Sequence, residues 1–301
     1  MPYRSGFVSL IGRTNVGKST LLNRLLGEKF SIVSDKPQTT RNRIQGILTR
    51  DEGQAVFLDT PGLHSARTQL GQRMNQFATS ALDDIDLILF VTTADSSKVG
   101  SGDQRILSQL EQSKHPRFLV LNKCDLVTLE HRERLRDQFY SLHSWAGYYP
   151  ISAQYGEGVT ELSDAVFQAL PEGPQFYPEE MIVDHPERFL AAEIIREKVL
   201  LLTRDEVPHG VAVVVERFSE EDVRSGDSTL IRIEATIYVD RESPKRILIG
   251  AKGAMLKQIG TLARQDIEKL LDRRVYLELW VKVRHDWRNN EASLREFGYR
   301  K

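Results

Sequence analysis

The sequence predicts two joined domains, an α/β domain built on a mostly parallel sheet and a smaller α+β domain that follows it. In the first half, apolar runs typical of strands alternate with segments of helical spacing, which favours a parallel sheet with helices on both faces. The alternation ends at residues 171–178, which contain three prolines and one glycine. We therefore expect a first domain at residues 1–170, a linker at residues 171–185 and a second domain at residues 186–301.

The first domain should contain a hairpin followed by strands that alternate with helices. Its predicted strands are residues 7–11, 43–49, 55–58, 87–91, 117–121 and 148–151, and its predicted helices are residues 20–26, 103–112, 129–142 and 158–170. The turn chemistry of residues 51–53, Asp-Glu-Gly, joins the second and third strands. Ligands of parallel sheets bind at the carboxyl ends of the strands, so the residues that follow each strand are the candidates for a site.

Composition excludes several classes of protein. The chain has 301 residues, of which 40% are hydrophobic and 28% charged, and its net charge of −1 is not that of a globally basic nucleic-acid binder. A single cysteine, Cys124, excludes an intramolecular disulfide and suits a reducing compartment. We find no apolar run of membrane-spanning length, no secretory signal and no zinc-binding spacing of histidines, so we expect a cytoplasmic protein without zinc.

The segment after the first strand fits the phosphate-binding pattern GxxxxGK[S/T] without a gap. It consists of Gly12, Arg13, Thr14, Asn15, Val16, Gly17, Lys18 and Ser19, and Thr20 opens the helix that follows. Its glycines let successive N–H groups point at phosphate oxygens, and the helix dipole adds positive charge there. Lys18 would reach the β- and γ-phosphates, and the Ser19 hydroxyl would bind Mg²⁺. The alternative is a tight strand-to-helix turn that matches the pattern by chance.

Two further segments could respond to a γ-phosphate. In the polar loop at residues 35–41, the Thr40 hydroxyl could close over Mg²⁺ and let go on hydrolysis, although a solvated loop with idle Thr39 and Thr40 is the alternative. The third strand ends in Asp59, Thr60, Pro61 and Gly62. The Asp59 carboxylate would hold the Mg²⁺ hydration shell and the Gly62 N–H would bind the γ-phosphate. The predicted catalytic residues are therefore Lys18, Thr40, Asp59 and Gly62.

Residues at two other strand ends could recognise a base. They are Asn122, Lys123, Cys124 and Asp125 after one strand, and Ser152 and Ala153 after the next. The Asp125 carboxylate can accept hydrogen bonds from guanine N1–H and the exocyclic amine, whereas adenine offers no matching pair of donors. Asn122 would bind the base from the other side, the Lys123 stem would cover its face and the Ala153 N–H would bind guanine O6. Cys124 is interpreted as a filler residue.

In their order along the chain, the motifs described above resemble those of the translation-factor-type small GTPases with a P-loop. The resemblance implies a GTP-hydrolysing enzyme that binds GTP or GDP with Mg²⁺ held by Ser19, Thr40 and Asp59. Leu63 stands where Ras-like GTPases place a water-orienting glutamine, which implies slow intrinsic hydrolysis. In relatives with the same Asn-Val-Gly-Lys-Ser run, the asparagine at the position of Asn15 helps to bind K⁺, and the alternative is that Asn15 is a plain loop residue.

The second domain has a different order of elements. We expect a helix at residues 186–203, strands at 211–218, 230–239 and 275–283, and a helix whose core face carries Leu256, Ile259, Ala263, Ile267 and Leu270. The turn Gly250-Ala251-Lys252-Gly253 precedes that helix, where two glycines would let a nucleic-acid backbone approach closely. Residues 243–284 carry ten Lys/Arg against four Asp/Glu, a net charge of +6 that favours phosphate contacts, although a simple turn and a solvated face are the alternatives.

This arrangement resembles a type II KH domain, with the order helix, strand, strand, helix, helix, strand. The resemblance implies single-stranded RNA as ligand. The predicted RNA-binding residues are Ile249, Gly250, Ala251, Lys252, Gly253 and Lys257.

Taken together, the two halves resemble the Era family of bacterial ribosome-assembly GTPases. The resemblance also covers the loop Pro-Gln-Thr-Thr-Arg at residues 37–41, the domain junction at 188–198 and the strand at 278–283. It implies a monomer whose KH domain binds the 3′ end of 16S ribosomal RNA in the 30S subunit under the control of GTP, with some contact to the inner membrane.

Two other functions stay open. A GTPase of tRNA modification shares the Asn-Val-Gly-Lys-Ser run but usually carries a C-terminal catalytic cysteine, whereas Cys124 is the single cysteine of this chain. A constitutive RNA-binding module with structural GTP would bind RNA equally in every nucleotide state.

Overall fold

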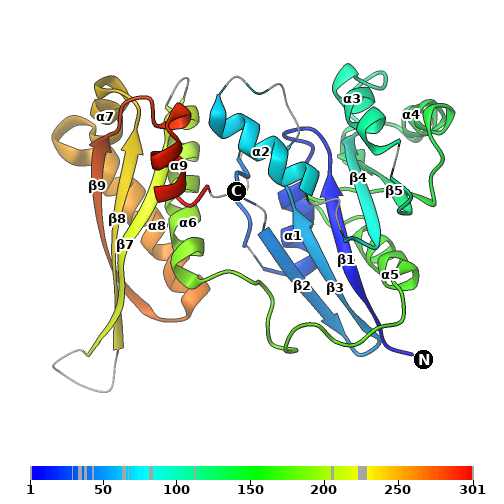
Figure 1. The fold of residues 1–301 in the computed structure, drawn as a ribbon, viewed down its shortest axis with the longest axis horizontal. Coiled ribbons are helices and arrows are strands. Elements are labelled where there is room, and N and C mark those ends of the chain that lie inside the picture. Colours follow the sequence, from blue (N-terminus) through cyan, green and yellow to red (C-terminus); the bar gives the residue numbers. More distant parts are fainter. Residues whose placement is uncertain are drawn as a thin grey trace. The chain divides into compact units, whose positions relative to one another are not determined.

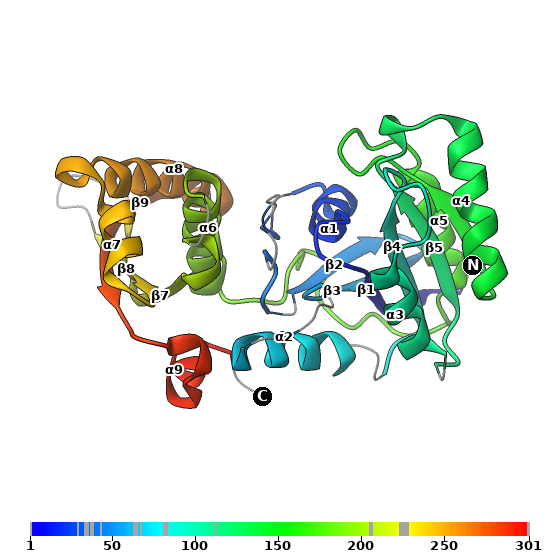
Figure 2. The same cartoon turned by 90° about the horizontal axis from the view of Figure 1, so that it is seen from above.

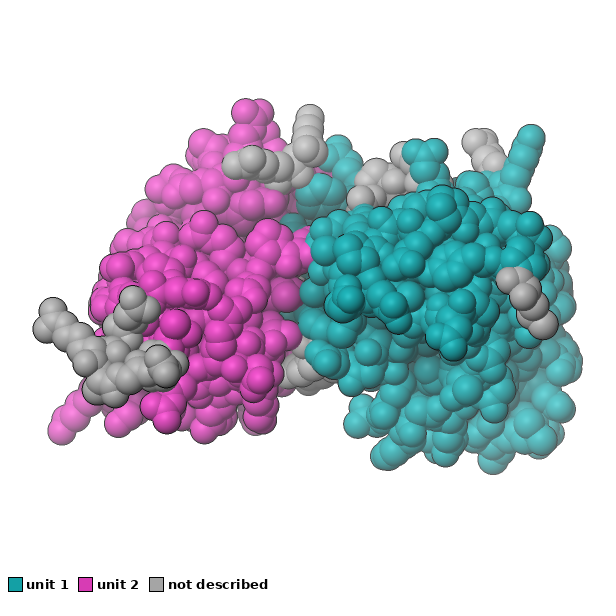
Figure 3. Space-filling model, turned by 90° about the horizontal axis from the view of Figure 1, so that it is seen from below, with its two compact units in different colours: residues 1–33, 40–66, 74–184 teal, residues 34–39, 67–73, 185–301 magenta. Residues whose placement is uncertain are grey.

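A computed structural model describes most of the chain and divides it into two compact units. The described residues are 2–28, 30–32, 36, 39–42, 44–62, 66, 68–80, 84–111, 113–204, 207–222 and 229–299. Unit 1 comprises residues 1–33, 40–66 and 74–184, and unit 2 comprises residues 34–39, 67–73 and 185–301 (Figure 3). Two short segments that lie early in the sequence therefore belong to the unit that is formed mainly by the second half of the chain.

Unit 1 contains the predicted alternation of strands and helices (Figure 1). Its elements are β1 (Arg4–Ile11), α1 (Lys18–Leu26), β2 (Ile44–Arg50), β3 (Gly53–Asp59), α2 (Gln69–Ser80), β4 (Leu87–Thr93), α3 (Ser101–Leu110), β5 (Arg117–Asn122), the 3₁₀ turn η1 (Cys124–Leu126), α4 (Leu129–Leu142), β6 (Gly147–Pro150) and α5 (Val159–Ala169). The sheet order is β2-β3-β1-β4-β5-β6, and β2 is antiparallel to β3 while the other pairs are parallel. The prediction of a mostly parallel sheet is confirmed.

The central strands of this sheet are covered on both faces. Every residue of β3 and β4 is buried, as expected for strands that lie between two layers of helices. Helices α1 and α5 contact each other on one face, and α2 and α3 lie on the other (Figure 2). The carboxyl ends of β1, β3, β4 and β5 therefore meet at one edge, where the candidate residues were expected.

Helix α2 was not predicted from the sequence. Leu70, Met74 and Ala78 are each at most 2% exposed and recur every four residues, so one face of the helix is apolar. This spacing is a helical signal that the sequence does contain. The first residues of α2, up to Arg73, belong to unit 2, and the remainder belongs to unit 1.

Residues 171–184, which make up most of the predicted linker, pack along unit 1. The Ser5 N–H donates to the Pro171 carbonyl at 3.0 Å, and the Ile47 N–H donates to the Ile182 carbonyl at 2.7 Å. The rings of Phe7 and Phe176 stack with their centroids 5.2 Å apart. This segment is thus ordered by contacts with the sheet that its proline-rich composition does not reveal.

One buried side chain organises that contact. Gln54 in β3 is fully buried, and its Oε1 accepts hydrogen bonds from the N–H groups of Phe176 and Tyr177, both at 2.9 Å. Its Nε2 donates to the Tyr177 carbonyl and to the Thr49 hydroxyl, also at 2.9 Å. All the hydrogen-bonding capacity of one amide is therefore used to fix a turn of the chain against the sheet.

Unit 2 has the predicted order of a type II KH domain. Its elements are α6 (Glu187–Leu202), η2 (Pro208–Gly210), β7 (Ala212–Asp222), β8 (Thr229–Val239), α7 (Glu242–Ile249), η3 (Ala251–Gly253), α8 (Ala254–Leu271), β9 (Arg274–Val283), η4 (Trp287–Asn289) and α9 (Glu291–Glu296). The sheet order is β7-β8-β9, with β7 antiparallel and β9 parallel to β8. Residues 246–249 form the last turn of α7.

The core of unit 2 lies between one face of this sheet and two helices. Residues 231, 233, 235, 237 and 239 of β8 are fully buried, and α6 and α8 cover that face (Figures 1 and 2). The predicted core residues Ile259, Ala263 and Ile267 of α8 are also fully buried, whereas Leu256 and Leu270 are half-buried.

An aromatic cluster near the end of the chain was also not predicted. Trp287 is fully buried, its ring packs against Phe297 and Tyr299, and its Nε1 donates to the Gly210 carbonyl at 2.9 Å. Arg73 donates to the Tyr299 carbonyl and pairs with Glu291. These contacts join residues 68–73 to the rest of unit 2.

Within the described residues, no helix has the length and apolar composition needed to cross a membrane. The same residues contain no group of three or more His, Cys, Asp or Glu side chains that could hold a metal ion.

The substitution Gln54→Ala should detach the segment that Gln54 holds. It leaves the N–H groups of Phe176 and Tyr177 without their acceptor, so we expect a loss of about 1–3 kcal/mol in the free energy of unfolding. Hydrogen exchange of residues 173–183 should accelerate more than that of β4. Gln104→Ala, which removes an exposed glutamine, is the control, and equal exchange in both variants would contradict this account.

Candidate nucleotide site and nucleic-acid groove

The loop between β1 and α1 needs glycine at two positions. Gly17 has a φ of +95°, and a Cβ there would lie 2.2 Å from Asn122 Nδ2. A Cβ on Gly12 would lie 2.1 Å from the Val91 carbonyl oxygen of β4. Asn15 also has a positive φ, of 63°. The backbone can therefore curl at the N-terminus of α1 in the way that an anion site requires.

Lys18 lies buried across this loop. Its Nζ donates to the carbonyls of Gly12 at 3.0 Å and Arg13 at 2.8 Å. Burial lowers the pKa of Lys18 to about 8, while nearby Asp59 opposes that shift and Arg13 adds to it. A phosphate group at this position would favour the charged ammonium and raise its pKa again.

Asp59, at the end of β3, accepts hydrogen bonds from the hydroxyl groups of three different segments. Its Oδ2 accepts from Ser19 and from Ser31, both at 2.8 Å, and from Thr40 at 3.4 Å, and the hydroxyls of Ser19 and Thr40 are 2.9 Å apart. Burial raises the pKa of Asp59, against the opposing effects of Lys18 and these hydroxyls.

The donor set around Asp59 fits Mg²⁺. Its Oδ1 is buried and has no hydrogen-bond partner among the described residues, although a carboxylate oxygen in such a place needs one. Carboxylate and hydroxyl oxygens are the ligands that this hard cation prefers. Ser19, Thr40 and Asp59 are therefore the residues that could hold it.

Ser31 was not predicted from the sequence. It is 1% exposed and is positioned by Asn23 of α1, whose Oδ1 accepts from the Ser31 N–H and whose Nδ2 donates to the Ser31 carbonyl, both at 2.8 Å. No motif marks Ser31, because its role depends on where the fold places it relative to Asn23 and Asp59.

The remaining predicted residues of the phosphate end lie close to this loop. Arg13 Nε donates to Asp103 Oδ1 at 2.9 Å, which ties the loop to the first turn of α3. A Cβ on Gly62 would lie 2.6 Å from the backbone nitrogen of Thr14, so residue 62 passes directly over the loop. Thr60 donates to the carbonyl of residue 10 at 2.9 Å, and the adjoining Pro61 is buried. Leu63 lies outside the described residues.

A pocket of about 230 Å³ lies where base recognition was predicted. Its lining residues are Gly17, Thr20, Asn122, Lys123, Asp125, Leu126, Ala153 and Gln154. Leu126 and Gln154 are additions to the predicted set.

Hydrogen bonds within the protein connect the residues around this pocket. The Ala153 N–H, which we predict to bind guanine O6, donates to Asn122 Oδ1 at 2.9 Å. Asn122 Nδ2 in turn donates to the Val16 carbonyl at 2.8 Å, and Lys123 pairs with Asp95 at 3.2 Å. Asn122 therefore connects the base pocket to the phosphate loop.

The two other residues predicted near the base lie behind the pocket lining. Cys124 is buried with its Sγ 3.1 Å from the Leu121 carbonyl, and burial raises its pKa to about 11, so the thiol is not a nucleophile near neutral pH. The Ser152 hydroxyl accepts from the Tyr155 N–H at 3.4 Å.

In unit 2, the turn between α7 and α8 depends on its glycines. Gly250 and Gly253 have φ values of 71° and 80°, and Lys252 between them has a φ of 50°. A Cβ on Gly250 would lie 2.9 Å from the Met255 nitrogen, whereas one on Gly253 would have no described atom within 4 Å. Gly253 thus leaves the N-terminus of α8 open to a ligand.

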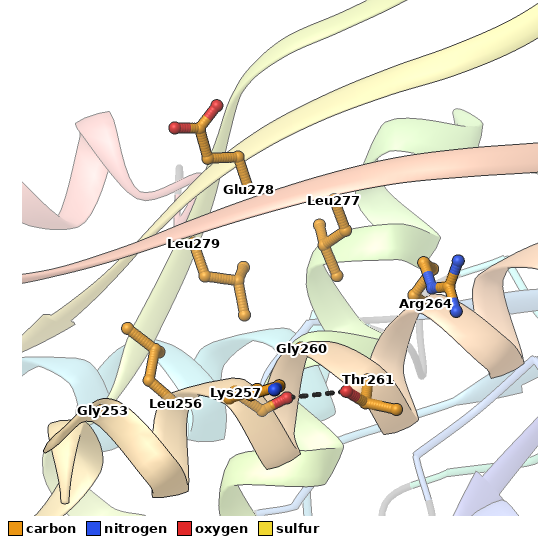
Figure 4. A pocket seen from close by; sticks show the side chains of 9 residues that line it. All are labelled: Gly253, Leu256, Lys257, Gly260, Thr261, Arg264, Leu277, Glu278 and Leu279. Carbon is orange, nitrogen blue, oxygen red and sulfur yellow. Dashed lines mark hydrogen bonds between the residues drawn. The ribbon is translucent and has the colours of Figure 1, made fainter.

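A groove of about 430 Å³ runs from this turn along α8 and β9 (Figure 4). It is lined by Gly253, Leu256, Lys257, Gly260, Thr261, Arg264, Leu277, Glu278 and Leu279. Two of the predicted RNA-binding residues, Gly253 and Lys257, line it. The other four, at positions 249–252, lie in the preceding turn, where Ala251 and Lys252 are exposed and Ile249 is half-buried.

Four groove residues of α8 were not predicted to bind RNA although the sequence contains a signal for them, namely Leu256, Gly260, Thr261 and Arg264. Positions 253, 256, 257, 260, 261 and 264 recur at helical spacing and so form one face of the helix. This face lies beside the buried one that the sequence analysis identified.

Comparison with protein families matches both halves of the chain. Residues 7–123 match the family model described as 50S ribosome-binding GTPase, and residues 206–288 match that of the KH domain. Fold and site together define the class of the protein as a GTPase joined to a KH domain.

Individual relatives match over nearly the whole chain. GTPase Era of Syntrophus aciditrophicus is 52% identical over 297 residues, which cover 99% of this chain and 95% of that protein. GTPase Era of Geobacter metallireducens is 52% identical over 302 residues, covering 99% and 98%. The chain therefore belongs to the Era family of GTPases.

Two solved structures are similar over the same length. Era in complex with MgGDPNP and nucleotides 1506–1542 of 16S ribosomal RNA is 41% identical, covers 99% of this chain and 100% of that chain, and has a TM-score of 0.95. An Era variant from Aquifex aeolicus bound to GDP and AlF₄⁻ is 42% identical, with the same coverage and a TM-score of 0.93.

The lowered pKa of Lys18 predicts that nucleotide binding takes up a proton at alkaline pH. Above about pH 8 the free protein holds Lys18 neutral, while a bound polyphosphate would keep it charged, so affinity should fall as pH rises. Calorimetry of GDP binding in buffers of different ionisation enthalpy should give an uptake that approaches about one proton near pH 9 and far less near pH 7. Equal uptake at both pH values would show that Lys18 is not the group involved.

Proposed function

We propose that this protein is a GTP-controlled RNA-binding protein that assists assembly of the small ribosomal subunit through the 3′ end of 16S ribosomal RNA. Support for the RNA comes from the similar Era structure with nucleotides 1506–1542, and from the groove along α8. Support for nucleotide control comes from one observation, the different partners of the neighbouring residues Thr39 and Thr40.

At the nucleotide site, each side chain has a definite part in the proposal. Lys18 balances the charge of the phosphates, and the Gly62 N–H binds the γ-phosphate from the opposite side. Mg²⁺, held by Ser19, Thr40 and Asp59, would supply positive charge to the phosphate oxygens. Leu63 cannot orient a nucleophilic water as a glutamine would, so intrinsic hydrolysis should be slow.

If Asn15 binds K⁺, hydrolysis should be faster in K⁺ than in Na⁺ buffer, and equal rates would exclude that role.

Thr39 and Thr40 are bonded to different units. The Thr40 hydroxyl contacts Ser19 and Asp59 within unit 1. Within unit 2, Arg196 of α6 donates to the Thr39 carbonyl. A single peptide bond joins the two threonines, so a shift of Thr40 on nucleotide binding must also move the acceptor of Arg196.

Arg196 is suited to respond to such a shift. It is 1% exposed, and Glu193 accepts from it through both carboxylate oxygens, at 2.8 and 2.7 Å. The two hydrogen bonds to Glu193 fix the orientation of the planar guanidinium, so it does not turn to follow a moving carbonyl. A shift of the Thr39 carbonyl would therefore break its hydrogen bond with Arg196.

The segment that follows β3 is also divided between the two units. Residues 60–62 belong to unit 1, whereas residues 67–73 belong to unit 2. The Gln69 N–H donates to Asn289 Oδ1 at 3.2 Å, and Arg73 contacts the final residues of the described chain. Both segments that we propose to respond to the γ-phosphate thus end in bonds to the unit with the RNA groove.

Two finer parts of the proposal come from the family resemblance. They are association with the 30S subunit and peripheral contact with the inner membrane. Co-sedimentation with purified 30S subunits and with anionic vesicles would test each separately, and lack of binding would remove that part.

Gly253→Asp should separate the two activities. It places a carboxylate at the N-terminus of α8, where we propose that RNA phosphates bind, so RNA affinity should fall by at least about tenfold while GTP hydrolysis continues. Gly298→Asp is the matched control, because Gly298 also has a positive φ, of 87°, and no described atom within 4 Å of a Cβ. Loss of both activities in Gly253→Asp alone would argue against two separable sites.

Arg196→Lys should weaken the coupling of RNA binding to nucleotide state. A lysine cannot hold both oxygens of Glu193 and the Thr39 carbonyl together, so the ratio of RNA affinities with GTP analogue and with GDP should fall at least about threefold, within the usual range of allosteric coupling. Arg188→Lys is the control, since Arg188 also lies on α6 and donates to a carbonyl, that of Val215 at 2.9 Å. An unchanged ratio in Arg196→Lys would exclude this contact as the link.

A further inference from the structure

Asn23 of α1 holds the chain at residues 30–31 through its side-chain amide. Its Oδ1 accepts hydrogen bonds from the Phe30 N–H at 3.0 Å and from the Ser31 N–H at 2.8 Å. Its Nδ2 donates to the Ser31 carbonyl at 2.8 Å. One side chain therefore fixes both polar backbone groups of Ser31, and the backbone at this residue is tied to the helix that begins at Lys18.

The hydroxyl of Ser31 makes a separate contact, with the carboxylate of Asp59. Ser31 is 1% exposed, and its Oγ donates to Asp59 Oδ2 at 2.8 Å, an ordinary length for a hydrogen bond between two oxygens. Asp59 is itself fully buried, and a buried polar group that loses its partner is costly. Asn23 already holds the backbone of residue 31, so the fold does not need this hydroxyl to keep the segment in place.

Ser31 differs from the two other residues whose hydroxyls donate to Asp59. Ser19 and Thr40 could hold Mg²⁺ together with Asp59, and their hydroxyls lie 2.9 Å apart. Within the part of the chain that the structure describes, no hydrogen bond joins the Ser31 hydroxyl to either of them. Ser31 therefore approaches the carboxylate apart from the pair of candidate ligands.

The orientation of the Asp59 carboxylate decides which of its oxygens is available to a cation. The last torsion of an aspartate side chain has broad energy minima, so the carboxylate plane turns easily unless hydrogen bonds hold it. Ser19 and Ser31 donate to Oδ2, both at 2.8 Å, from segments on either side of α1. Oδ1 is buried and has no hydrogen-bond partner among the described residues. The two serines together thus hold one oxygen and leave the other available.

We propose that Ser31 is a positioning residue of the metal site, whose hydroxyl holds Asp59 so that Oδ1 stays available to the hydration shell of Mg²⁺. Asn23 acts only by holding Ser31 in place. The proposal rests on the Mg²⁺ site that we propose at Ser19, Thr40 and Asp59. Hydrogen bonds from outside the ligand set orient metal-binding side chains in many proteins, and their loss typically weakens metal affinity about 10- to 100-fold.

Ser31→Ala tests this proposal through the affinity for Mg²⁺. The substitution removes the hydroxyl and keeps the backbone groups that bond to Asn23. The Mg²⁺ affinity of the GDP-bound protein can be measured from the release rate of a fluorescent GDP at increasing Mg²⁺ concentrations, and it should fall at least about tenfold. GDP affinity in EDTA, without Mg²⁺, should stay unchanged, because the proposal gives Ser31 no contact with the nucleotide.

Ser9→Ala is the matched control. Ser9 of β1 is also a fully buried serine, and its hydroxyl has no hydrogen-bond partner among the described residues. The control therefore removes the same atom without a bond to Asp59, and its Mg²⁺ affinity should equal that of the wild type. A merely structural role of Ser31 would instead lower the thermal unfolding midpoint of the nucleotide-free protein and leave Mg²⁺ affinity unchanged, which would overturn the proposal.

Asn23→Ala tests the part that we assign to Asn23. It releases the backbone of Ser31, so Mg²⁺ affinity should fall in the same direction as in Ser31→Ala. The double variant should bind Mg²⁺ no more weakly than Ser31→Ala alone, because Asn23 acts through the hydroxyl that is already missing. Losses that add in the double variant would show that Asn23 acts independently of Ser31 and would overturn this part.

Asp59→Asn separates this proposal from the metal site on which it rests. Weaker Mg²⁺ binding in Asp59→Asn together with wild-type Mg²⁺ affinity in Ser31→Ala would overturn the role of Ser31 and leave the metal site in place. Wild-type Mg²⁺ affinity in Asp59→Asn would overturn both.

Discussion

The carboxylate of Asp59 is the constraint around which the nucleotide site is built. It stands at the end of a fully buried strand and receives hydroxyl groups from the phosphate loop, from the residues after α1 and from Thr40. Burial disfavours the charged form of the Asp59 carboxylate, and it also disfavours the charged form of the nearby Lys18 ammonium. A polyphosphate with a divalent cation would offset both penalties at once, because it supplies the partner that each charged group needs.

Two of the segments at the nucleotide site continue along the chain into unit 2. Thr40 is one residue from Thr39, whose carbonyl is bonded to Arg196, and residues 60–62 are followed closely by the segment that Arg73 anchors. The chain therefore places two short segments between nucleotide chemistry and the unit that carries the groove. We regard this as the physical basis for the control of RNA binding by nucleotide that we propose, since few residues would need to move for both sites to be affected.

The parts that the sequence predicted well are those with strict steric or periodic requirements. Gly12 and Gly17 are needed because a Cβ would overlap neighbouring atoms, and the alternation of β8 follows from one buried face. The parts that were missed depend on single tertiary contacts. Gln54 and Ser31 belong to no motif, and their roles follow only from where the fold brings their partners. Helix α2 is different, because its four-residue spacing was visible in the sequence.

Arg196 illustrates the same limit. In the sequence it lies in a charged stretch of α6 that reads as solvent-exposed, yet it is 1% exposed and paired with Glu193. Long charged side chains are rarely buried unless paired, so sequence pattern alone favours the wrong location.

The most direct test of this account is the affinity of the unmodified protein for a strand of the 16S 3′ end and for a scrambled strand, at one salt concentration. It should be measured with GTP analogue, with GDP and without nucleotide. The account predicts that the true sequence is preferred and that this preference is strongest with the GTP analogue. Equal affinity in all three states would contradict it, and would leave a GTPase and an RNA-binding domain that share a chain without communicating.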